Sequence, residues 1–419
     1  MRHRRDWLKS VASGMAATVA GSLGSGAWSG ARGQEPARSA VRRDVRRPVA
    51  PTPGRNALRP VLEPWEVRLP EDPQTAALLE TVRSRHKIPG MIGAILKGPA
   101  VVSIGATGVR KVDEADAIRI NDLVHLGSCT KAMTATLLGT LFEEGLLTAS
   151  STLAAVFPEY ADRLHPDFRD VTLSHLLTHR AGLPHDGDWW NLPGRTPTEK
   201  RYAALVDLCS VAPKSRPGTA YSYSNAGYVL AGLMAEQVTG ATWEDLMRAR
   251  VFEPLNMYSA GFGPPGSDRS SRDDDAPYGH HLVRGKLEAI RHDNPEVMGP
   301  AGTVHSTIAD WAKFALAHLR GERQGAKLLR PETYRDLHTP LPGTSYAGGW
   351  MAADRPWAGG RALNHSGSNT MWFATVWLAP ARDFGMLVAA NQGGGTSDQA
   401  CDEAVGALIG RYQASFATG

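Results

Sequence analysis

The chain has 419 residues, of which 42% are apolar and 21% are charged, an ordinary composition for a folded protein. Residues 1–60 hold 12 Lys and Arg against 3 Asp and Glu, a net charge of +9. The net charge of the whole chain is +4, so residues 61–419 carry a net charge of 4 − 9 = −5. We therefore expect no nucleic-acid partner. No run approaches about 20 apolar residues, so the processed chain is not expected to be an integral membrane protein.

Residues 1–33 have the pattern of an export signal. The Arg4-Arg5 pair comes shortly before Trp7, and a weakly apolar stretch rich in Ala, Gly and Ser follows to about Gly30. This order is similar to a twin-arginine signal, with a general secretory signal as the second route. We expect an exported protein, periplasmic or secreted; the alternative is mitochondrial targeting.

Residues 34–64 are rich in Pro and Arg and show no apolar period, so they cannot bury enough surface to offset the entropy of ordering. They are predicted to be a disordered linker before a folded domain at 65–412. Cys129, Cys209 and Cys401 are too few and too scattered for a disulfide framework, and they are expected to be buried free thiols.

The periodicity of the folded part predicts strands near both ends of the domain and helices between them. The expected helices are 75–85, 129–145, 172–178, 199–210, 225–239, 242–251, 307–320 and 397–412. The expected strands are 91–96, 101–106, 361–366, 371–378 and 384–390. An α/β (α+β) fold follows, in which the strands from both ends pair in one antiparallel sheet flanked by helices. The helical middle forms a large insertion, and a catalytic cleft is expected where it meets the sheet.

The first chemical motif is Ser128-Cys129-Thr130-Lys131, which stands just before an apolar helical pattern. Residues i and i+3 share a helix face, and a helix start favours developing negative charge. Lys131 can therefore take the Ser128 proton, provided that burial or neighbouring positive charge keeps the lysine neutral. Ser84-Arg85-His86-Lys87 has the same letters late in a helix and is interpreted as solvated surface.

The second motif is Tyr223-Ser224-Asn225, where a loop enters a helix. A tyrosine near two ammonium groups is expected to lose its proton more easily and to relay protons, and Asn225 would bind Lys131 or a substrate amide. The alternative is a packed aromatic residue followed by a helix cap.

The third motif is His365-Ser366-Gly367, at the end of a predicted strand, with Ser368 next. An N–H group on such an edge strand could complete an oxyanion hole with the N–H of Ser128. The alternative is a structural histidine.

Together the three motifs resemble those of the penicillin-recognising serine hydrolases, in the branch of class C β-lactamases, D-alanyl-D-alanine carboxypeptidases, D-aminopeptidases and esterases. The segments Leu176–Leu183, Gly299–Gly302 and Ser306–Asp310 look similar too, so the resemblance spans about residues 70–410. It implies a β-lactamase/transpeptidase-like fold without metal or cofactor.

The resemblance also implies a role for each motif residue. Ser128 would be the nucleophile, with Lys131 and Tyr223 as the acid/base pair. Asn225 would position the substrate, and the strand at residues 365–368 would bind it. Within that strand His365, Ser366 and Gly367 are substrate-binding, and Ser368 is an oxyanion donor as well.

Two departures narrow the expected function. Tyr-Ser-Asn replaces the Ser-Asp-Asn of class A enzymes, so proton transfer should run through Tyr223. His365 stands where most β-lactamases have a lysine that holds a substrate carboxylate, and it should be largely neutral. We expect a serine hydrolase that acylates Ser128 and acts on a small-molecule or peptide ester or amide, of DD-peptidase, D-aminopeptidase or esterase type, with at most weak β-lactamase activity. The alternative is a penicillin-binding sensor or peptide-binding module with slow or no turnover.

Three further features of the sequence are weaker indications of function. Asp273–Asp275 with His280-His281 could suggest a metal site, but Gly, Ser and Pro around them favour a solvated loop. Trp189-Trp190 would line the acyl pocket or pack at the surface. The pentapeptide Gly-x-Ser-x-Gly of another hydrolase fold does not occur, the nearest match being Gly343–Ala347.

Overall fold

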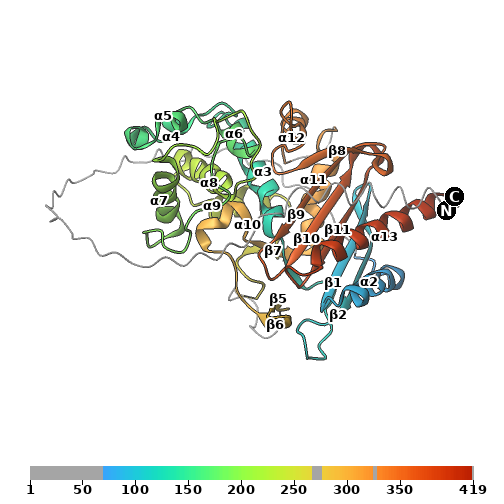
Figure 1. The fold of residues 1–419 in the computed structure, drawn as a ribbon. Coiled ribbons are helices and arrows are strands. Elements are labelled where there is room, and N and C mark those ends of the chain that lie inside the picture. Colours follow the sequence, from blue (N-terminus) through green and yellow to red (C-terminus); the bar gives the residue numbers. More distant parts are fainter. Residues whose placement is uncertain (1–68, 267–275, 324–327, 418–419) are drawn as a thin grey trace. The chain divides into compact units, whose positions relative to one another are not determined.

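The computed structural model describes residues 69–266, 276–323 and 328–417, all of which belong to one unit, Leu62–Gly419. The predicted export signal and linker lie outside the described residues, as does Asp273–Asp275. Figure 1 shows a sheet in one half of this unit and a group of helices in the other.

The main sheet has six strands in the order β2-β1-β11-β10-β9-β8, and every neighbouring pair is antiparallel. Its strands are β1 (Gly90–Lys97), β2 (Ala100–Gly108), β8 (Met351–Arg355), β9 (Gly360–Ser368), β10 (Phe373–Ala379) and β11 (Phe384–Ala390). The predicted pairing of the two ends of the domain is confirmed, because Met91 of β1 lies opposite Ala390 of β11.

Helices cover both faces of this sheet. Helices α2 (Pro73–His86) and α13 (Ser397–Ala417) pack together on one face, and α11 (Ile308–Gly321) lies on the other (Figure 1). Every residue of β11 is buried, as expected for a central strand covered on both faces, and this explains its continuous apolar run. Helix α2 starts where the Asp72 side chain accepts a hydrogen bond from the Gln74 N–H.

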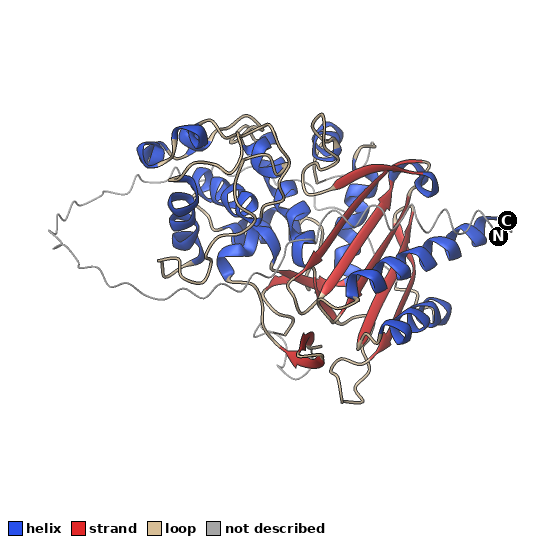
Figure 2. Cartoon of the chain, in the orientation of Figure 1, coloured by secondary structure: helices blue, strands red, loops and turns tan. Residues whose placement is uncertain are grey.

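The region between β2 and β8 is mostly helical, as predicted (Figure 2). Its α-helices are α3 (Thr130–Glu143), α4 (Leu153–Val156), α5 (Pro166–Arg169), α6 (Leu173–Leu177), α7 (Pro197–Cys209), α8 (Asn225–Thr239), α9 (Trp243–Met247), α10 (Gly299–Gly302), α11 and α12 (Pro331–His338). Short 3-10 turns include η1 (Gly127–Cys129), η2 (Pro158–Arg163) and η5 (Glu296–Met298), and a π-helical turn, η3 (Arg248–Phe252), continues α9.

The prediction missed the strands of this region. They are β3 (Leu123–His125), β4 (Gly261–Phe262), β5 (Gly279–Val283), β6 (Lys286–Ile290) and β7 (Val304–Thr307). They form a three-stranded sheet, β3-β7-β4, and a hairpin, β5-β6. Strands β3, β4 and β7 have two to four residues, at or below the shortest run that shows a period-two pattern, and β5 and β6 have only five each.

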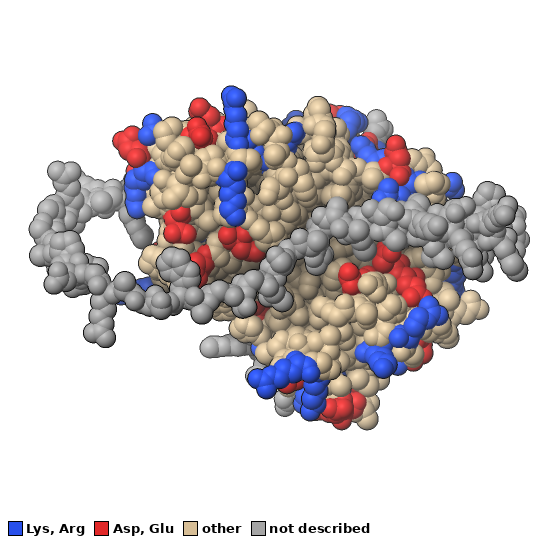
Figure 3. Space-filling view, viewed as in Figure 1, with Lys and Arg blue, Asp and Glu red and all other residues tan. Residues whose placement is uncertain are grey.

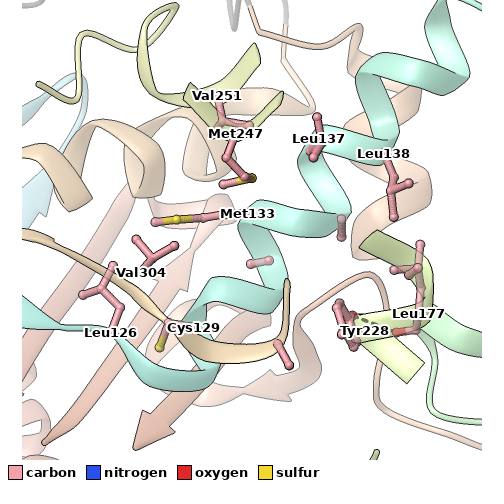
Figure 4. Close-up of a cluster of buried hydrophobic side chains, with 14 of the residues drawn as sticks. Leu126, Cys129, Met133, Leu137, Leu138, Leu177, Tyr228, Met247, Val251 and Val304 are labelled. Carbon is pink, nitrogen blue, oxygen red and sulfur yellow. Dashed lines mark hydrogen bonds between the residues drawn. The ribbon is translucent and has the colours of Figure 1, made fainter. Parts of the chain in front are cut away.

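Helix α3 runs through the main hydrophobic core, with twelve of its residues buried. Figure 4 shows Met133 and Leu137 of α3 beside Met247 of α9 and Val251 of η3, while Val304 of β7 lies near Leu126. The start of α3, where Lys131 stands directly after the turn that holds Ser128, is therefore held by contacts with several elements. The three cysteines are buried and free, which confirms the prediction.

The surface is mixed in charge. On the face drawn in Figure 3, acidic and basic side chains are interspersed outside the area that the grey atoms cover. Among the described residues, no helix is both long enough and apolar enough to cross a bilayer.

Candidate active site

Ser128 lies in the 3-10 turn η1, one turn before Lys131 on α3, and its side chain is half-buried. Gly127 before it has a φ of +50°, a left-handed conformation that favours glycine. A Cβ on Gly127 would lie 2.4 Å from the Ser368 nitrogen, and a Cβ on Gly367 would lie 2.4 Å from the Ser128 nitrogen. Two glycines thus allow the end of β9 to lie directly against the serine turn.

Lys131 is fully buried and has three hydrogen-bond partners. Its Nζ lies 3.0 Å from Ser128 Oγ, 2.8 Å from Asn225 Oδ1 and 2.7 Å from the Ala301 carbonyl oxygen. Burial lowers the pKa of Lys131 to about 7, although the charge of Asp186 acts in the opposite direction. Both the charged and the neutral amine are therefore populated near neutral pH, which meets the condition that sequence reasoning set for a lysine base.

Tyr223 lies beside both residues. The Ser128 hydroxyl is close enough to act on the pKa of the Tyr223 phenol, and Lys131 Nζ is 5.0 Å from the centroid of the Tyr223 ring. Burial nevertheless raises the pKa of Tyr223, so the expectation of an easily deprotonated tyrosine is wrong. The reason is that desolvation of a phenolate outweighs the opposing effect of the Ser128 hydroxyl.

Asn225 is the first residue of α8, and the orientation of its amide is fixed on both sides. Its Oδ1 accepts from Lys131, and its Nδ2 donates to Asp186 Oδ1 at 2.9 Å. Because the Asp186 carboxylate can only accept, the amide must present its N–H group on that side. Asp186 also accepts from Trp189 Nε1 at 3.0 Å and contacts His185 Nδ1 at 2.5 Å. These hydrogen bonds lower the pKa of Asp186 to about 2 against the opposing effect of burial, so it is a fixed negative charge next to the site.

His365 lies beneath the site, with 4% of its surface exposed. Its Nδ1 donates to the Ser366 carbonyl at 2.8 Å, and its Nε2 accepts from the Tyr346 hydroxyl at 2.9 Å. Burial lowers the pKa of His365 to about 3, so the ring is neutral. Both ring nitrogens of His365 thus have protein partners, and its partner Tyr346 packs edge-on against Tyr223 with ring centroids 6.3 Å apart.

The rest of the third motif presents backbone to the site. Strand β8 begins at Met351, opposite Asn364, so β8 does not extend along the last residues of β9, although β9 as a whole is not an edge strand. The Ser366 hydroxyl lies 2.9 Å from Thr375 Oγ1, and the Ser368 hydroxyl donates to the Trp372 carbonyl at 2.6 Å. Both hydroxyls are therefore engaged within the protein, as is the Ser366 carbonyl, which accepts from His365 Nδ1.

Sequence reasoning missed Asp186 and Tyr346. Both lie in loops without a recognisable motif, and Tyr346 falls within the pentapeptide discarded as a nucleophile motif. Trp189 and Trp190 help to line a pocket of about 710 Å³, where Trp190 stacks on His292 with ring centroids 5.6 Å apart. Within the described ranges, no group of three or more His, Cys, Asp or Glu could hold a metal ion.

A serine hydrogen-bonded to a buried lysine, with a tyrosine beside it and the end of a strand packed against its turn, has the arrangement of a serine hydrolase that uses lysine as its base. Comparison with known proteins agrees. Residues 75–410 match the Beta-lactamase family, and the chain belongs to it.

Three similar proteins illustrate the breadth of this family. Penicillin-binding protein 4 of Amycolatopsis lactamdurans is 28% identical over 330 residues, which cover 76% of this chain and 84% of that protein. An unguisins hydrolase of Aspergillus violaceofuscus is 26% identical, covering 73% of this chain and 58% of its own length. A class C β-lactamase from Rhodobacter sphaeroides has the same fold, with a TM-score of 0.67 and 21% identity over 82% of this chain and 100% of that chain. The protein is thus a β-lactamase-related serine hydrolase.

Proposed function

We propose that this enzyme hydrolyses an ester or amide through an acyl-enzyme on Ser128. The observation that carries the proposal is the buried Lys131, whose pKa of about 7 and hydrogen bond to Ser128 Oγ suit a general base. When neutral, Lys131 donates its two N–H groups to Asn225 Oδ1 and the Ala301 carbonyl, so its lone pair faces the serine hydroxyl.

In acylation, Ser128 Oγ attacks the substrate carbonyl carbon and gives its proton to Lys131. The negative oxygen that forms accepts hydrogen bonds from the backbone N–H groups of Ser128 and Ser368. The bond between the carbonyl carbon and the oxygen or nitrogen of the leaving group then breaks. The leaving alcohol or amine takes a proton from Tyr223, and Tyr223 recovers a proton from Lys131. A water molecule repeats these steps in reverse and releases the acid.

We further propose that the acyl group is uncharged or positively charged. Asp186 is negative, His365 is neutral, and Lys131 is only partly charged near neutral pH, so this group of residues contains no permanent cation to bind a carboxylate. The pocket that Trp189 and Trp190 help to line is not an apolar acyl pocket, because its wall also contains Lys200, Glu244, Arg291 and Glu296. The lack of a permanent cation beside Ser128 favours an esterase or peptidase over a dedicated β-lactamase.

The test is intact-protein mass spectrometry and turnover with an activated ester and a penicillin. We expect an adduct on Ser128 that disappears as product forms, and loss of both in Ser128→Ala. The matched control is Ser84→Ala, which alters the other Ser-x-x-Lys sequence and should leave activity unchanged. Wild-type activity in Ser128→Ala would refute the proposal, and a stable adduct without product release would support a penicillin-binding sensor instead.

We also propose that the chain is exported, on the basis of its Arg4-Arg5 pair and the weakly apolar stretch that follows. Fractionation of cells that express the full chain tests this. Mature protein outside the cytoplasm, and its absence there after Arg4 and Arg5 are both changed to Lys, is the expected result. Export that survives this double substitution would indicate the general secretory route, and retention of the unchanged chain in the cytoplasm would refute the proposal.

A further inference from the structure

Three buried polar side chains lie next to the proposed reaction centre without taking part in the chemistry. They are His125 on β3, Asp293 in the loop before η5, and Asn369 in the turn between β9 and β10, with 0%, 8% and 2% of their surfaces exposed. Buried polar groups of this kind are costly unless they are hydrogen-bonded. All three are, and they bond to one another.

The direction of each hydrogen bond follows from the backbone groups at the two ends. The Gly127 N–H donates to His125 Nδ1 at 3.1 Å, so the ring proton must be on Nε2, which donates to Asp293 Oδ2 at 2.8 Å. At the other end, Asn369 Oδ1 accepts from the N–H groups of Met371 and Trp372 at 3.2 and 3.0 Å. Its Nδ2 must therefore be the group that donates to Asp293 Oδ1, at 3.0 Å.

The two ends of this network adjoin the two proposed oxyanion donors. Gly127 immediately precedes Ser128, and Asn369 immediately follows Ser368. The same two backbone segments are in close contact, since a Cβ on Gly127 would come within 2.4 Å of the Ser368 nitrogen. The two N–H groups belong to elements far apart in sequence, and in the part of the chain that the structure describes Asp293 is hydrogen-bonded to both His125 and Asn369.

We propose that Asp293 is a positioning residue that sets the separation of the two oxyanion donors through His125 and Asn369. This inference rests on the acyl-enzyme function proposed above. A carboxylate suits the place because it accepts on both oxygens and donates on neither. An amide at position 293 would turn its N–H groups toward the donor of His125 or that of Asn369, whichever way it is oriented. A misplacement of about 1 Å in an oxyanion donor costs about 100-fold in rate.

The test compares Asp293→Asn with Asp310→Asn. Asp310 is a matched control, because it is a similarly buried aspartate (7% exposed) that bonds to Ser259 and Lys313 away from the site. We expect Asp293→Asn to lower kcat about 10- to 100-fold with little change in KM. Asp310→Asn should lower only the thermal unfolding midpoint.

A second measurement separates positioning from general damage. A boronic acid bonds to Ser128 Oγ, whose proton passes to Lys131, and the tetrahedral boron places an oxygen in the oxyanion hole. We expect its affinity for Asp293→Asn to fall by the same factor as kcat/KM, while the affinity of the reaction product, which lacks a tetrahedral centre, stays near that of the wild type. The double variant Asp293→Asn with Asn369→Asp restores a donor facing an acceptor and should recover part of the loss; the contact from the Asn294 N–H to Asp293 Oδ1 is not restored.

Unchanged kcat and boronate affinity in Asp293→Asn would overturn the inference. Equal weakening of boronate and product binding would also overturn it, since that is what a merely structural role produces. If Asp293→Asn does not fold, Asn369→Ala undergoes the same measurements with the His125–Asp293 pair intact. A wild-type protein that neither turns over esters nor binds the boronate at Ser128 would refute the proposed function itself, and the inference with it.

Discussion

The charge of Asp186 should control the pH at which the enzyme becomes active. The acid limb of kcat/KM reports the pKa of the base in the free enzyme, here Lys131. Only neutral Lys131 can accept the Ser128 proton, so activity should rise with pH through a midpoint near 7. Below this midpoint kcat/KM should fall about tenfold per pH unit.

The effect of Asp186→Asn follows from the geometry. Asp186 Oδ1 is 2.9 Å from Asn225 Nδ2, and Asn225 Oδ1 is 2.8 Å from Lys131 Nζ, which places the two charges about 7 Å apart across one amide group. At an effective dielectric constant of about 20 their attraction is about 2.4 kcal/mol, or about 1.7 pH units. The Asp186 side chain is 41% exposed, so solvent screening reduces this two- to threefold, to about 0.6–0.9 units.

Removal of the negative charge destabilises the charged lysine, so the midpoint should move to lower pH by that amount. The amide can keep the contacts with Trp189 and Asn225 because both are made by Asp186 Oδ1. The assay is kcat/KM for an uncharged ester between pH 5 and 9, with Asp188→Asn in the same loop as the control. A midpoint that stays in place or moves upward would refute the reasoning, as would an equal shift in the control.

Two other substitutions test the backbone contact and the charge of the third motif. A Cβ on Gly367 would lie 2.2 Å from the Leu126 oxygen, so Gly367→Ala should lower kcat/KM about 100-fold or more, whereas Gly410→Ala, with open space around it, should leave activity unchanged. Wild-type rates in Gly367→Ala would contradict the close packing. His365→Lys should raise kcat/KM for carboxylate-bearing β-lactams relative to neutral esters by about tenfold, with a lower unfolding midpoint because the site is buried. An unchanged substrate ratio would contradict the role given to charge at this position.

The fold was predictable where burial leaves a strong pattern in the sequence. Strands β1 and β11 are covered on both faces and read as apolar runs, and α3 is a long helix through the core. Strands β4 and β7 have two and four residues and exist because β7 lies between β3 and β4. Such strands are specified by their neighbours in space, which a local pattern does not reveal.

The site was predictable to the extent that its geometry is local. Ser128 and Lys131 are one helical turn apart, so their proximity follows from the period of the helix. Asp186 and Tyr346 join the site only through contacts made by loops. The direction of the Tyr223 pKa shift depends on how deeply the side chain is buried. The sequence shows which charged residues are candidates for neighbours, but it does not show how much water surrounds the tyrosine.

The identity of residue 365 links substrate choice to base strength. With a neutral His365, the pKa of Lys131 is governed by burial and by Asp186. A permanent cation at 365 would attract a substrate carboxylate, and it would also repel the charged form of Lys131 and lower its pKa. His365→Lys should therefore move the acid limb of kcat/KM to lower pH in the same protein that gains activity on carboxylates. If the substrate ratio changed while the limb stayed in place, the two residues would not be coupled, and the preference for uncharged or cationic acyl groups would have to arise from Asp186 alone.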